Sequence, residues 1–458
     1  MSKQFDAIVI GAGQAGPALA SRLTAAGQTV AYVERKLFGG TCVNTGCTPT
    51  KAMVASAFAA HTARRGAEYG VGTGPVTVDI KAVQARRDAI VMKSRTGVEG
   101  SLRKNDRCTV FVGTARFASP TTVRVGDEVL EAKQIFVNVG GRATVPDMPG
   151  VHEVPYLTNT SLLALETIPK HLVIVGGSYI GIEFGQMYRR FGSEVTIIEK
   201  DSRLVSREDE DVSAAVKEIL VGEGITVRLN AKCIHMAPHE EGVSVGLDCV
   251  EADHPSIGSH VLLAVGRTPN TRDLGLDKAG VKVDEHGYIV VDDELRTSVP
   301  GIYAMGDCNG KGAFTHTAYN DFEIVAANLL DGDPRRVSDR IACYAMYMDP
   351  PLARIGMSER EVRATGRPAL MGTRPMTKVN RALEKGESLG FMKVLVDAET
   401  KKILGASLLG VGCDEAIHGL LDLMYAGAPY TTISRAVHIH PTVSELIPTL
   451  LQALTPLV

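Results

Sequence analysis

Short apolar runs alternate with helical patterns at the start of the chain. Ala7 to Ile10 is an uninterrupted apolar run that leads into the glycine-rich segment GAGQAG. A helical pattern with small residues follows from Pro17 to Ala26, and a second apolar run extends from Thr29 to Glu34. Apolar runs of this length are typical of buried strands. The pattern therefore predicts a strand, a tight turn, a helix and a second strand of a doubly wound sheet.

The glycines of this first turn suit a nucleotide pyrophosphate. Gly11 and Gly13 allow a tight turn and a close approach of the backbone to phosphate, while Gly16 permits close packing of the helix on the strand. Glu34, at the end of the second strand, is placed to bind ribose hydroxyls. Taken alone, this fingerprint also fits an ordinary turn between a strand and a helix.

The same pattern occurs a second time further along the chain. LVIVGGSYIG, from Leu172 to Gly181, repeats the strand and turn, and VTIIE repeats the second strand. The matched positions, all at one offset from the first unit, are Gly176, Ser178, Gly181 and Glu199. Agreement of the turn and the acid in two places predicts two separate dinucleotide-binding domains and two bound nucleotides.

Several residues of the second unit bear on the nucleotide that it would bind. The Ser178 side chain could crowd the pyrophosphate or form a hydrogen bond with it. Glu199 would repel a ribose 2'-phosphate and accept hydrogen bonds from a free 2'-hydroxyl, which favours NADH over NADPH. Lys200 and Arg203 could partly neutralise this acid, or they could be solvated surface charges.

A close pair of cysteines follows the first unit, in the run GGTCVNTGCTPTK. In a straight α-helix, residues five apart have Cα atoms ~8 to 9 Å apart, beyond the ~7 Å limit for a disulfide. A bridge between Cys42 and Cys47 therefore needs a distorted turn, which Asn44 and Gly46 tolerate, and Pro49 fits the first turn of a helix after it. A strained bridge of this kind is easily reduced, so we interpret the cysteines as a redox pair. The alternatives are two buried thiols, a structural bridge or half a zinc site, and because no second pair with ligand spacing accompanies them we predict no bound metal.

A histidine and a glutamate near the C-terminus are candidates for proton transfer. The run HIHPTVSE places His440 before Pro441 and Glu445 shortly after it. A histidine oriented by a carboxylate can move a proton to or from a thiol near neutral pH, although the same spacing occurs in ordinary surface pairs. The preceding apolar runs, Phe391 to Val396 and Ile403 to Leu409, and the helical pattern after them predict a separate α+β domain.

The composition indicates a globular protein that acts on small molecules. At 458 residues the chain should divide into about three or four domains. Its 49 Lys and Arg nearly balance its 52 Asp and Glu, which leaves no basic field for nucleic acid or anionic lipid. No stretch reaches the ~20 apolar residues of a membrane span, and the short segment before the first strand leaves no room for a signal peptide. Because cysteines are few, we expect a cytoplasmic protein without a disulfide framework.

The motifs together resemble the pyridine nucleotide-disulfide oxidoreductases, the family of dihydrolipoamide dehydrogenase, glutathione reductase and mercuric reductase. The resemblance covers essentially the whole chain and is carried by GAGQAG, GGTCVNTGCTPTK, GGSYIGIE, AVGRTPN (264–270), YAMGDC (303–308) and HPTVSE. It implies an α/β fold with two Rossmann-type dinucleotide-binding domains, for FAD and for NADH, and a C-terminal α+β dimerisation domain. The expected boundaries are 1–148 for the FAD-binding domain, 149–270 for the NAD-binding domain, 271–338 for a return segment that completes the FAD and central region, and 339–458 for the dimerisation domain.

The resemblance also implies roles for the two thiols. Cys47 would face the flavin as the charge-transfer thiol, and Cys42 would be the interchange thiol that meets the substrate. His440, paired with Glu445, would serve Cys42 from the partner subunit. The active site would then need a homodimer, and a monomer should be inactive.

Other site residues are carried over in the same way. Lys51 and Glu183 match the ion pair beside the flavin, although a plain structural salt bridge is the alternative. Tyr179 matches the lid over the nicotinamide pocket, and Asp307 matches the acid on the ribityl chain of the flavin. The remaining residues that the resemblance assigns to cofactor binding are Thr41, Ala115, Thr315 and Gly266.

Departures from the family pattern bear on the substrate. The chain ends LLQALTPLV without the C-terminal cysteine pair of mercuric reductases, lacks their N-terminal metal-binding domain, and has His440 where they have a tyrosine. Glutathione reductases bind NADPH through arginines at the places of Glu199 and Val205. TPTKAMV and PPLARIGMSE resemble mercuric-reductase-like and bacterial metal-reductase members, so we rank a small disulfide, dithiol or metal-ion substrate of that group first and dihydrolipoamide dehydrogenase second. An FAD/NADH oxidase or quinone reductase with structural cysteines, and a nucleotide-binding redox sensor, are the alternatives from other classes.

Overall fold

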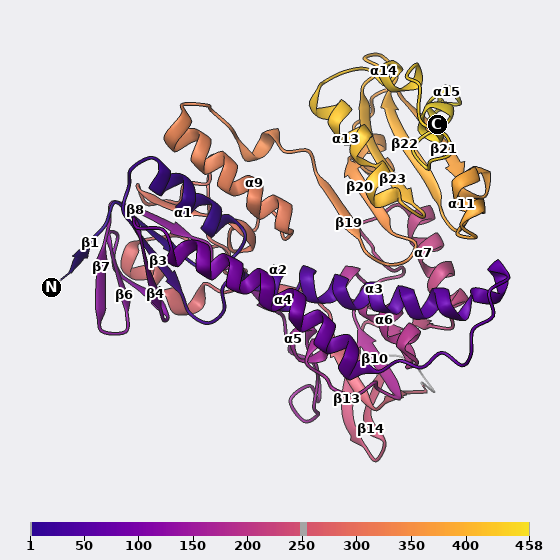
Figure 1. The fold of residues 1–458 in the computed structure, drawn as a ribbon, viewed down its shortest axis with the longest axis horizontal. Helices are drawn as coiled ribbons and strands as arrows, with labels where there is room; N and C mark the ends of the chain where they lie inside the picture. Colours follow the sequence, from indigo (N-terminus) through magenta and orange to yellow (C-terminus); the bar gives the residue numbers. More distant parts are fainter. Residues whose placement is uncertain (1, 248–253, 458) are drawn as a thin grey trace.

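The first nucleotide-type unit forms a five-stranded parallel sheet. A computed structural model describes residues 2–247 and 254–457 (Figure 1). The strand order is β18 (Ile302–Ala304), β8 (Gln134–Val137), β2 (Ala7–Ile10), β3 (Val30–Glu34) and β4 (Cys108–Val112), with every neighbouring pair parallel. All four residues of β2 are buried, as expected for a parallel strand covered on both faces. The outermost strand comes from a distant part of the sequence, so this sheet closes only when the chain returns.

Helices cover this sheet and a small antiparallel sheet lies beside it. Helix α1 (Ala15–Ala25) follows the glycine turn and packs against α9 (Thr315–Ala326). The small sheet has the order β1 (Lys3–Gln4), β7 (Glu128–Glu131), β6 (Thr122–Val125) and β5 (Ala115–Ser119). One continuous apolar core joins the large sheet to these elements.

The second unit repeats the parallel arrangement. Its sheet has the order β12 (Thr226–Arg228), β11 (Glu194–Ile198), β10 (His171–Val175) and β16 (His260–Leu263), all parallel. Helix α6 (Tyr179–Phe191) follows the second glycine turn, and α7 (Glu210–Gly222) follows β11. An antiparallel sheet of β13 (Ile234–His239), β14 (Gly242–Leu247) and β15 (Ser256–Gly258) completes it.

The C-terminal part is an antiparallel sheet with helices, as predicted. Its strands run in the order β19 (Cys343–Met346), β20 (Leu352–Gly356), β23 (Ile403–Leu409), β22 (Phe391–Asp397), β21 (Ala369–Pro375) and β24 (Thr455–Pro456). Helices α13 (His418–Tyr425), α14 (Thr431–Ser434) and α15 (Leu446–Gln452) accompany the sheet and share its core. The α/β fold class with a C-terminal α+β domain is confirmed.

Two long helices connect these parts. Helix α3 (Cys47–Arg64) packs against both α4 (Ile80–Arg103) and α6. The start of α3, preceded by the short helix α2 (Gly40–Thr45), lies where the two sheet units and the C-terminal domain approach one another (Figure 1). Within the described ranges, none of the helices combines the length and apolarity needed to cross a membrane.

Candidate active site

The two glycine turns have the same backbone geometry. Gly11 has a φ of +102°, and a Cβ added there would lie 2.3 Å from the carbonyl oxygen of Asn138. Gly176 has a φ of +115°, and its added Cβ would lie 2.4 Å from the carbonyl oxygen of Ala264. Only glycine fits such positions, because the left-handed conformation and the next strand both exclude a side chain. The repeat found in the sequence is therefore a repeat of structure.

The third glycine of each turn is required for close packing. A Cβ on Gly16 would lie 2.5 Å from the carbonyl oxygen of Gly11, and one on Gly181 would lie 2.0 Å from that of Gly176. Ser178 occupies the N-cap of α6 with an extended backbone and is exposed. Whether its hydroxyl crowds or binds a phosphate stays a prediction.

The acids at the strand ends, Glu34 and Glu199, accept equivalent backbone hydrogen bonds. The carboxylate of Glu34 accepts the backbone N–H groups of Ala12 and Lys36, both at 2.8 Å. The donors to Glu199 are at the equivalent positions, Gly177 at 2.6 Å and Asp201 at 3.0 Å. Both acids are buried. Each carboxylate is thereby oriented at the carboxyl end of its strand, where dinucleotide sugars bind in such folds.

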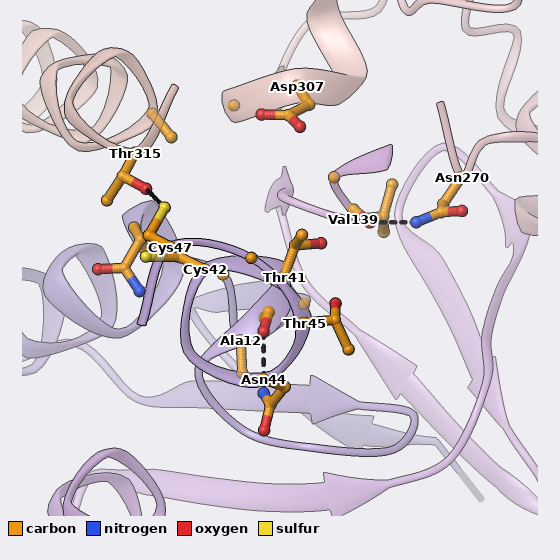
Figure 2. A pocket seen from close by; sticks show the side chains of 18 of the residues that line it. Ala12, Thr41, Cys42, Asn44, Thr45, Cys47, Val139, Asn270, Asp307 and Thr315 are labelled. Carbon is orange, nitrogen blue, oxygen red and sulfur yellow. Dashed lines mark hydrogen bonds between the residues drawn. The ribbon is translucent and has the colours of Figure 1, made fainter. Parts of the chain in front are cut away.

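A large cavity is lined by residues of the first turn and by both cysteines. Its volume is about 740 Å³, within the range usual for ligand sites. The predicted residues that line it are Gly11, Gly13, Glu34, Thr41, Cys42, Cys47, Lys51, Ala115, Tyr179, Glu183, Asp307 and Thr315. Figure 2 labels Thr41, Cys42, Cys47, Asp307 and Thr315 among them. Those outside its lining are Gly16, Gly176, Ser178, Gly181, Glu199, Gly266, His440 and Glu445.

The cysteines lie on either side of a break between two helices. Cys42 belongs to α2, and α3 begins at Cys47, with Gly46 between them at φ −132° and ψ −117°. A Cβ on Gly46 would lie 2.9 Å from the carbonyl oxygen of Thr41, so glycine allows the sharp change of direction. The Asn44 side chain donates to the Phe38 and Gly40 carbonyls, both at 2.9 Å, which holds the turn from the other side. The predicted distortion between the cysteines is present.

The two thiols differ in acidity. A hydrogen bond from Cys42 lowers the pKa of the Cys47 thiol to about 6, with help from Thr315 and Lys51, while burial opposes the change. The same interaction raises the pKa of Cys42 well above the ordinary value. Thr315 Oγ1 lies 3.1 Å from Cys47 Sγ, and Figure 2 shows this contact. Near neutral pH, Cys47 is thus the thiolate and Cys42 the protonated partner.

An ion pair lies beside the thiols. Lys51 Nζ donates to Glu183 Oε2 at 2.6 Å, and the backbone N–H of Tyr347 donates to Glu183 Oε1 at 2.8 Å. The ammonium also lies 4.9 Å from the centre of the Tyr347 ring. Lys51 and Glu183 come from different units, on α3 and α6, so the pair fixes α3 against the second unit and places a cation at the cavity wall.

Two further residues of the site were not predicted from the sequence. Arg267 pairs with Asp307 at 3.2 Å and donates to the Gly141 carbonyl at 2.7 Å. Asn138 donates to the carbonyl oxygens of both Gly11 and Gly13, and so braces the glycine turn. Asn138 directly follows the buried strand β8, a position at the carboxyl edge of the sheet that could have marked it as a site residue.

His440 and Glu445 are paired but lie away from the cavity. His440 Nδ1 lies 2.9 Å from Glu445 Oε2, and the histidine side chain is 68% exposed while the glutamate is 14% exposed. Helices α14 and α15, which flank His440 in the sequence, lie at the end of the C-terminal domain away from α2 and α3 (Figure 1). One copy of the chain therefore does not bring His440 to Cys42. A hydrophobic neighbour, Ile439, is 81% exposed on the same segment.

Cys308 has a structural environment. Its side chain is fully buried, and its thiol donates to the carbonyl oxygens of Met305 at 3.3 Å and Val137 at 3.6 Å. Burial raises its pKa to about 12. Its closeness to Asp307 in the sequence therefore does not make it a reactive thiol.

The cavity suits a flavin dinucleotide. Its lining combines the phosphate-type turn and a ribose-type acid with two thiols and a lysine. A Cβ on Gly40 would lie 2.6 Å from the Cα of Gly13, so small residues keep the turn and the cysteine segment in contact. FAD carries groups that match this lining, namely a pyrophosphate between an adenosine and a redox-active ring.

Comparison with known proteins agrees with this assignment. The family model "Pyridine nucleotide-disulphide oxidoreductase" matches residues 5–321, and the model of that family's dimerisation domain matches residues 343–451. The probable pyridine nucleotide-disulfide oxidoreductase RclA of Escherichia coli is 36% identical over 451 residues, covering 96% of this chain and 97% of that protein. The mercuric reductase of Streptomyces lividans is 32% identical over 457 residues, covering 98% of this chain and 96% of that protein. A dihydrolipoyl dehydrogenase of Thermus scotoductus is 34% identical over 446 residues, covering 97% and 96%.

A solved structure has the same fold over nearly the whole chain. The Cu(II) complex of the HOCl-induced flavoprotein disulfide reductase RclA from E. coli superimposes with a TM-score of 0.90 at 34% identity. The superposition covers 98% of this chain and 99% of that one.

Proposed function

The chain belongs to the pyridine nucleotide-disulphide oxidoreductase family, and from this premise we propose that it passes electrons from NADH through FAD to Cys42 and Cys47 and then to a disulfide or metal ion. Family membership makes it an FAD-dependent oxidoreductase that uses a pyridine nucleotide and carries a dimerisation domain. The choice of NADH, the residue roles and the acceptor are the proposed parts.

One observation carries the proposal. Cys42 and Cys47 share a cavity wall with the nucleotide-type turn, and only one of the two thiols is acidic. Dithiol exchange needs such an inequality, because one sulfur must be a stable thiolate while the other meets the acceptor. A structural pair of buried thiols would need neither the acidic member nor access to a cavity.

The positions of the cavity residues suggest a separate role for each in the proposed reaction. Bound FAD supplies the two-electron carrier between nicotinamide and thiols. Cys47, held by Thr315 at 3.1 Å, is the thiolate on the cofactor side, and Cys42 is the thiol that exchanges with the acceptor. The Lys51 ammonium, oriented by Glu183, holds positive charge at the cavity wall. Arg267 orients the carboxylate of Asp307 toward the same cavity.

The proton of Cys42 needs an acceptor from a second copy of the chain. His440 is exposed, is paired with Glu445, and lies outside the cavity of its own chain. We assign it to the cavity of the partner in a homodimer, where its imidazole would take the proton as Cys42 attacks the acceptor. The exposed Ile439 beside it would be covered by the same contact.

NADH is the proposed electron donor because of the charge at the second turn. Glu199 is buried and fixed by two backbone N–H groups, so it cannot easily swing away from a ribose 2'-phosphate. A like charge at that position disfavours NADPH, whereas a 2'-hydroxyl can donate to the carboxylate.

Steady-state turnover with NADH and NADPH against Cu(II), Hg(II), lipoamide and glutathione disulfide tests the function. We rank a small disulfide and Cu(II) first, because the chain is similar to E. coli RclA, a flavoprotein disulfide reductase whose structure holds Cu(II). Efficient turnover of lipoamide alone would instead identify a dihydrolipoamide dehydrogenase. With the preferred acceptor, Cys42→Ser should be inactive and Cys343→Ser, a partly buried cysteine elsewhere, should be active. Undiminished turnover of Cys42→Ser would indicate an oxidase or quinone reductase with structural cysteines.

A further inference from the structure

The proposed lid residue is hydrogen-bonded to a buried glutamate. Tyr179 is the first residue of α6 and lines the cavity. Its hydroxyl donates to Glu208 Oε1 at 3.3 Å, and its ring packs edge-on against Phe314 and Tyr344. Glu208 lies just before α7, and its side chain has 0% exposure. A carboxylate so deeply buried requires partners, and the lid tyrosine is only one of them.

The other partners come from the C-terminal domain. Tyr344 on β19 donates its hydroxyl to the same oxygen, Glu208 Oε1, and Arg354 on β20 donates to Oε2 at 3.0 Å. Tyr344 and Arg354 are directly opposite each other in the ladder that joins these strands. A cross-strand pair of the C-terminal domain therefore holds the glutamate of the second unit, and Tyr344 is not part of the cavity lining.

This arrangement decides what happens when the lid moves. The Tyr179 contact of 3.3 Å is long for a hydroxyl on a carboxylate, where 2.5–2.7 Å is usual for a strong bond. If the Tyr179 hydroxyl leaves, Glu208 still has Tyr344 on one oxygen and Arg354 on the other. The charge of Glu208 therefore keeps its partners when the lid opens, and lid opening avoids the large free-energy cost of an unpaired buried charge. Burial raises the pKa of Tyr179 to about 12, so its hydroxyl keeps the proton that it donates.

We propose that Glu208 is a positioning residue that latches Tyr179 closed, and that Tyr344, a second donor to the same oxygen, keeps the latch weak enough for nicotinamide to displace the lid. The inference rests on the proposed function, in which Tyr179 covers the nicotinamide pocket. It adds a role for the C-terminal domain in nucleotide binding: the donor that weakens the latch comes from that domain. Neither Glu208 nor Tyr344 takes part in electron transfer.

Removing the Tyr344 hydroxyl should tighten the latch. In Tyr344→Phe, Oε1 of Glu208 has Tyr179 as its remaining hydroxyl donor, so the lid is held more firmly. A hydrogen bond to a charged group can change an equilibrium constant, here that between the closed and open lid, by tenfold or more. NAD⁺ should therefore bind about threefold to tenfold more weakly. ADP-ribose, which fills the same turn but has no nicotinamide, should bind unchanged. Tyr179→Phe keeps the ring and loses the latch, so it should bind NAD⁺ at least as tightly as the wild type.

Calorimetric titration with NAD⁺ and with ADP-ribose tests the latch in the FAD-loaded protein. The proteins to compare are the wild type, Tyr344→Phe, Tyr179→Phe and the double variant. Tyr430→Phe serves as a control in the same domain. The latch predicts that Tyr344→Phe has no effect on NAD⁺ binding in the Tyr179→Phe background, because the hydroxyl it acts through is gone. Equal weakening of NAD⁺ and ADP-ribose, or an undiminished effect in the double variant, would overturn the latch. Should Tyr344→Phe fail to load FAD, weaker NAD⁺ binding by Tyr179→Phe would overturn the latch, and equal or tighter binding would support it. A wild-type protein that binds neither ligand would refute the NAD assignment itself, and the latch with it.

Discussion

Replacing Cys42 tests whether its hydrogen bond makes Cys47 acidic. In the native pair this bond is the largest cause of the lowered pKa of Cys47, ahead of Thr315 and Lys51. Cys42→Ala removes the donor, whereas Cys42→Ser keeps a hydroxyl that can donate in its place. The two variants differ by one donor group and both prevent a disulfide, so their comparison isolates the hydrogen bond.

The size of the effect follows from the thiolate fraction. A thiol with a pKa of about 6 is roughly 90% thiolate at pH 7, and one at the ordinary value near 9 is about 1% thiolate. A hydrogen bond to a charged group is worth about 1.5–3 kcal/mol, so its loss should raise the midpoint of the Cys47 titration by about one to two pH units. Because the pKa is lowered, the thiolate is present above the midpoint and is lost as the pH falls through it. Cys42→Ser should titrate close to pH 6 and Cys42→Ala clearly higher.

The long-wavelength absorbance of a thiolate beside oxidised flavin gives the readout. Each FAD-loaded variant is titrated from acid to alkaline pH, and the midpoint of the band reports the ionisation of Cys47. The matching Cys47→Ser variant should lack the band at every pH. Identical midpoints for Cys42→Ala and Cys42→Ser would refute the hydrogen-bond explanation, and a band that survives in Cys47→Ser would refute the placement of Cys47 beside the flavin.

Three further predictions address the turn, the donor and the dimer. Gly46→Ala should destabilise the protein by about 1–3 kcal/mol, because its Cβ would lie 2.9 Å from a carbonyl oxygen; thermal unfolding should show Gly100→Ala, a site in α4 with open space around it, to be neutral or stabilising. Glu199→Gln should narrow the preference for NADH over NADPH about tenfold, measured as the ratio of kcat/KM values, and an unchanged ratio would mean that this charge does not select the donor. His440→Gln and Cys42→Ser should each be inactive, but refolding them together should restore about a quarter of wild-type turnover, since half of the dimers then hold one complete site. No recovery in the mixture would show that His440 serves its own chain, and an active His440→Gln variant would show that His440 has no role.

Local sequence patterns identified the parts of the fold that depend on local geometry. The strand and glycine turn at Gly11, and their repeat at Gly176, could be predicted because a phosphate-type turn requires glycine at fixed spacing from an apolar strand. The break between Cys42 and Cys47 was predictable for the same reason, since an undistorted helix holds residues five apart beyond bonding reach. The antiparallel strands β22 and β23 followed from two apolar runs around a polar turn.

Contacts between distant segments could not be predicted from local sequence patterns. Asn138 braces the first turn from the end of β8, and Arg267 pairs with Asp307, which lies 40 residues further along the chain. Arg267 lies in AVGRTPN, one of the motifs that carry the family resemblance, but neither this motif nor the sequence around Asn138 shows which residue is the partner. The resemblance to a family singled out Lys51 and Glu183, but the sequence itself held no sign that the two side chains are 2.6 Å apart.

Local sequence patterns thus predict two nucleotide-type units, a cysteine pair in a bent segment and a distinct C-terminal domain, because each depends on the sterics of neighbouring residues. Which of the two thiols is acidic depends on tertiary contacts, since the hydrogen bond from Cys42 across the helix break and the contact with Thr315 of α9 lower the pKa of Cys47. Only the tertiary structure decided that Tyr179 and Tyr344 share one oxygen of Glu208. The physical reason is that pKa values and buried hydrogen bonds depend on distances in space, and chain separation does not fix those distances.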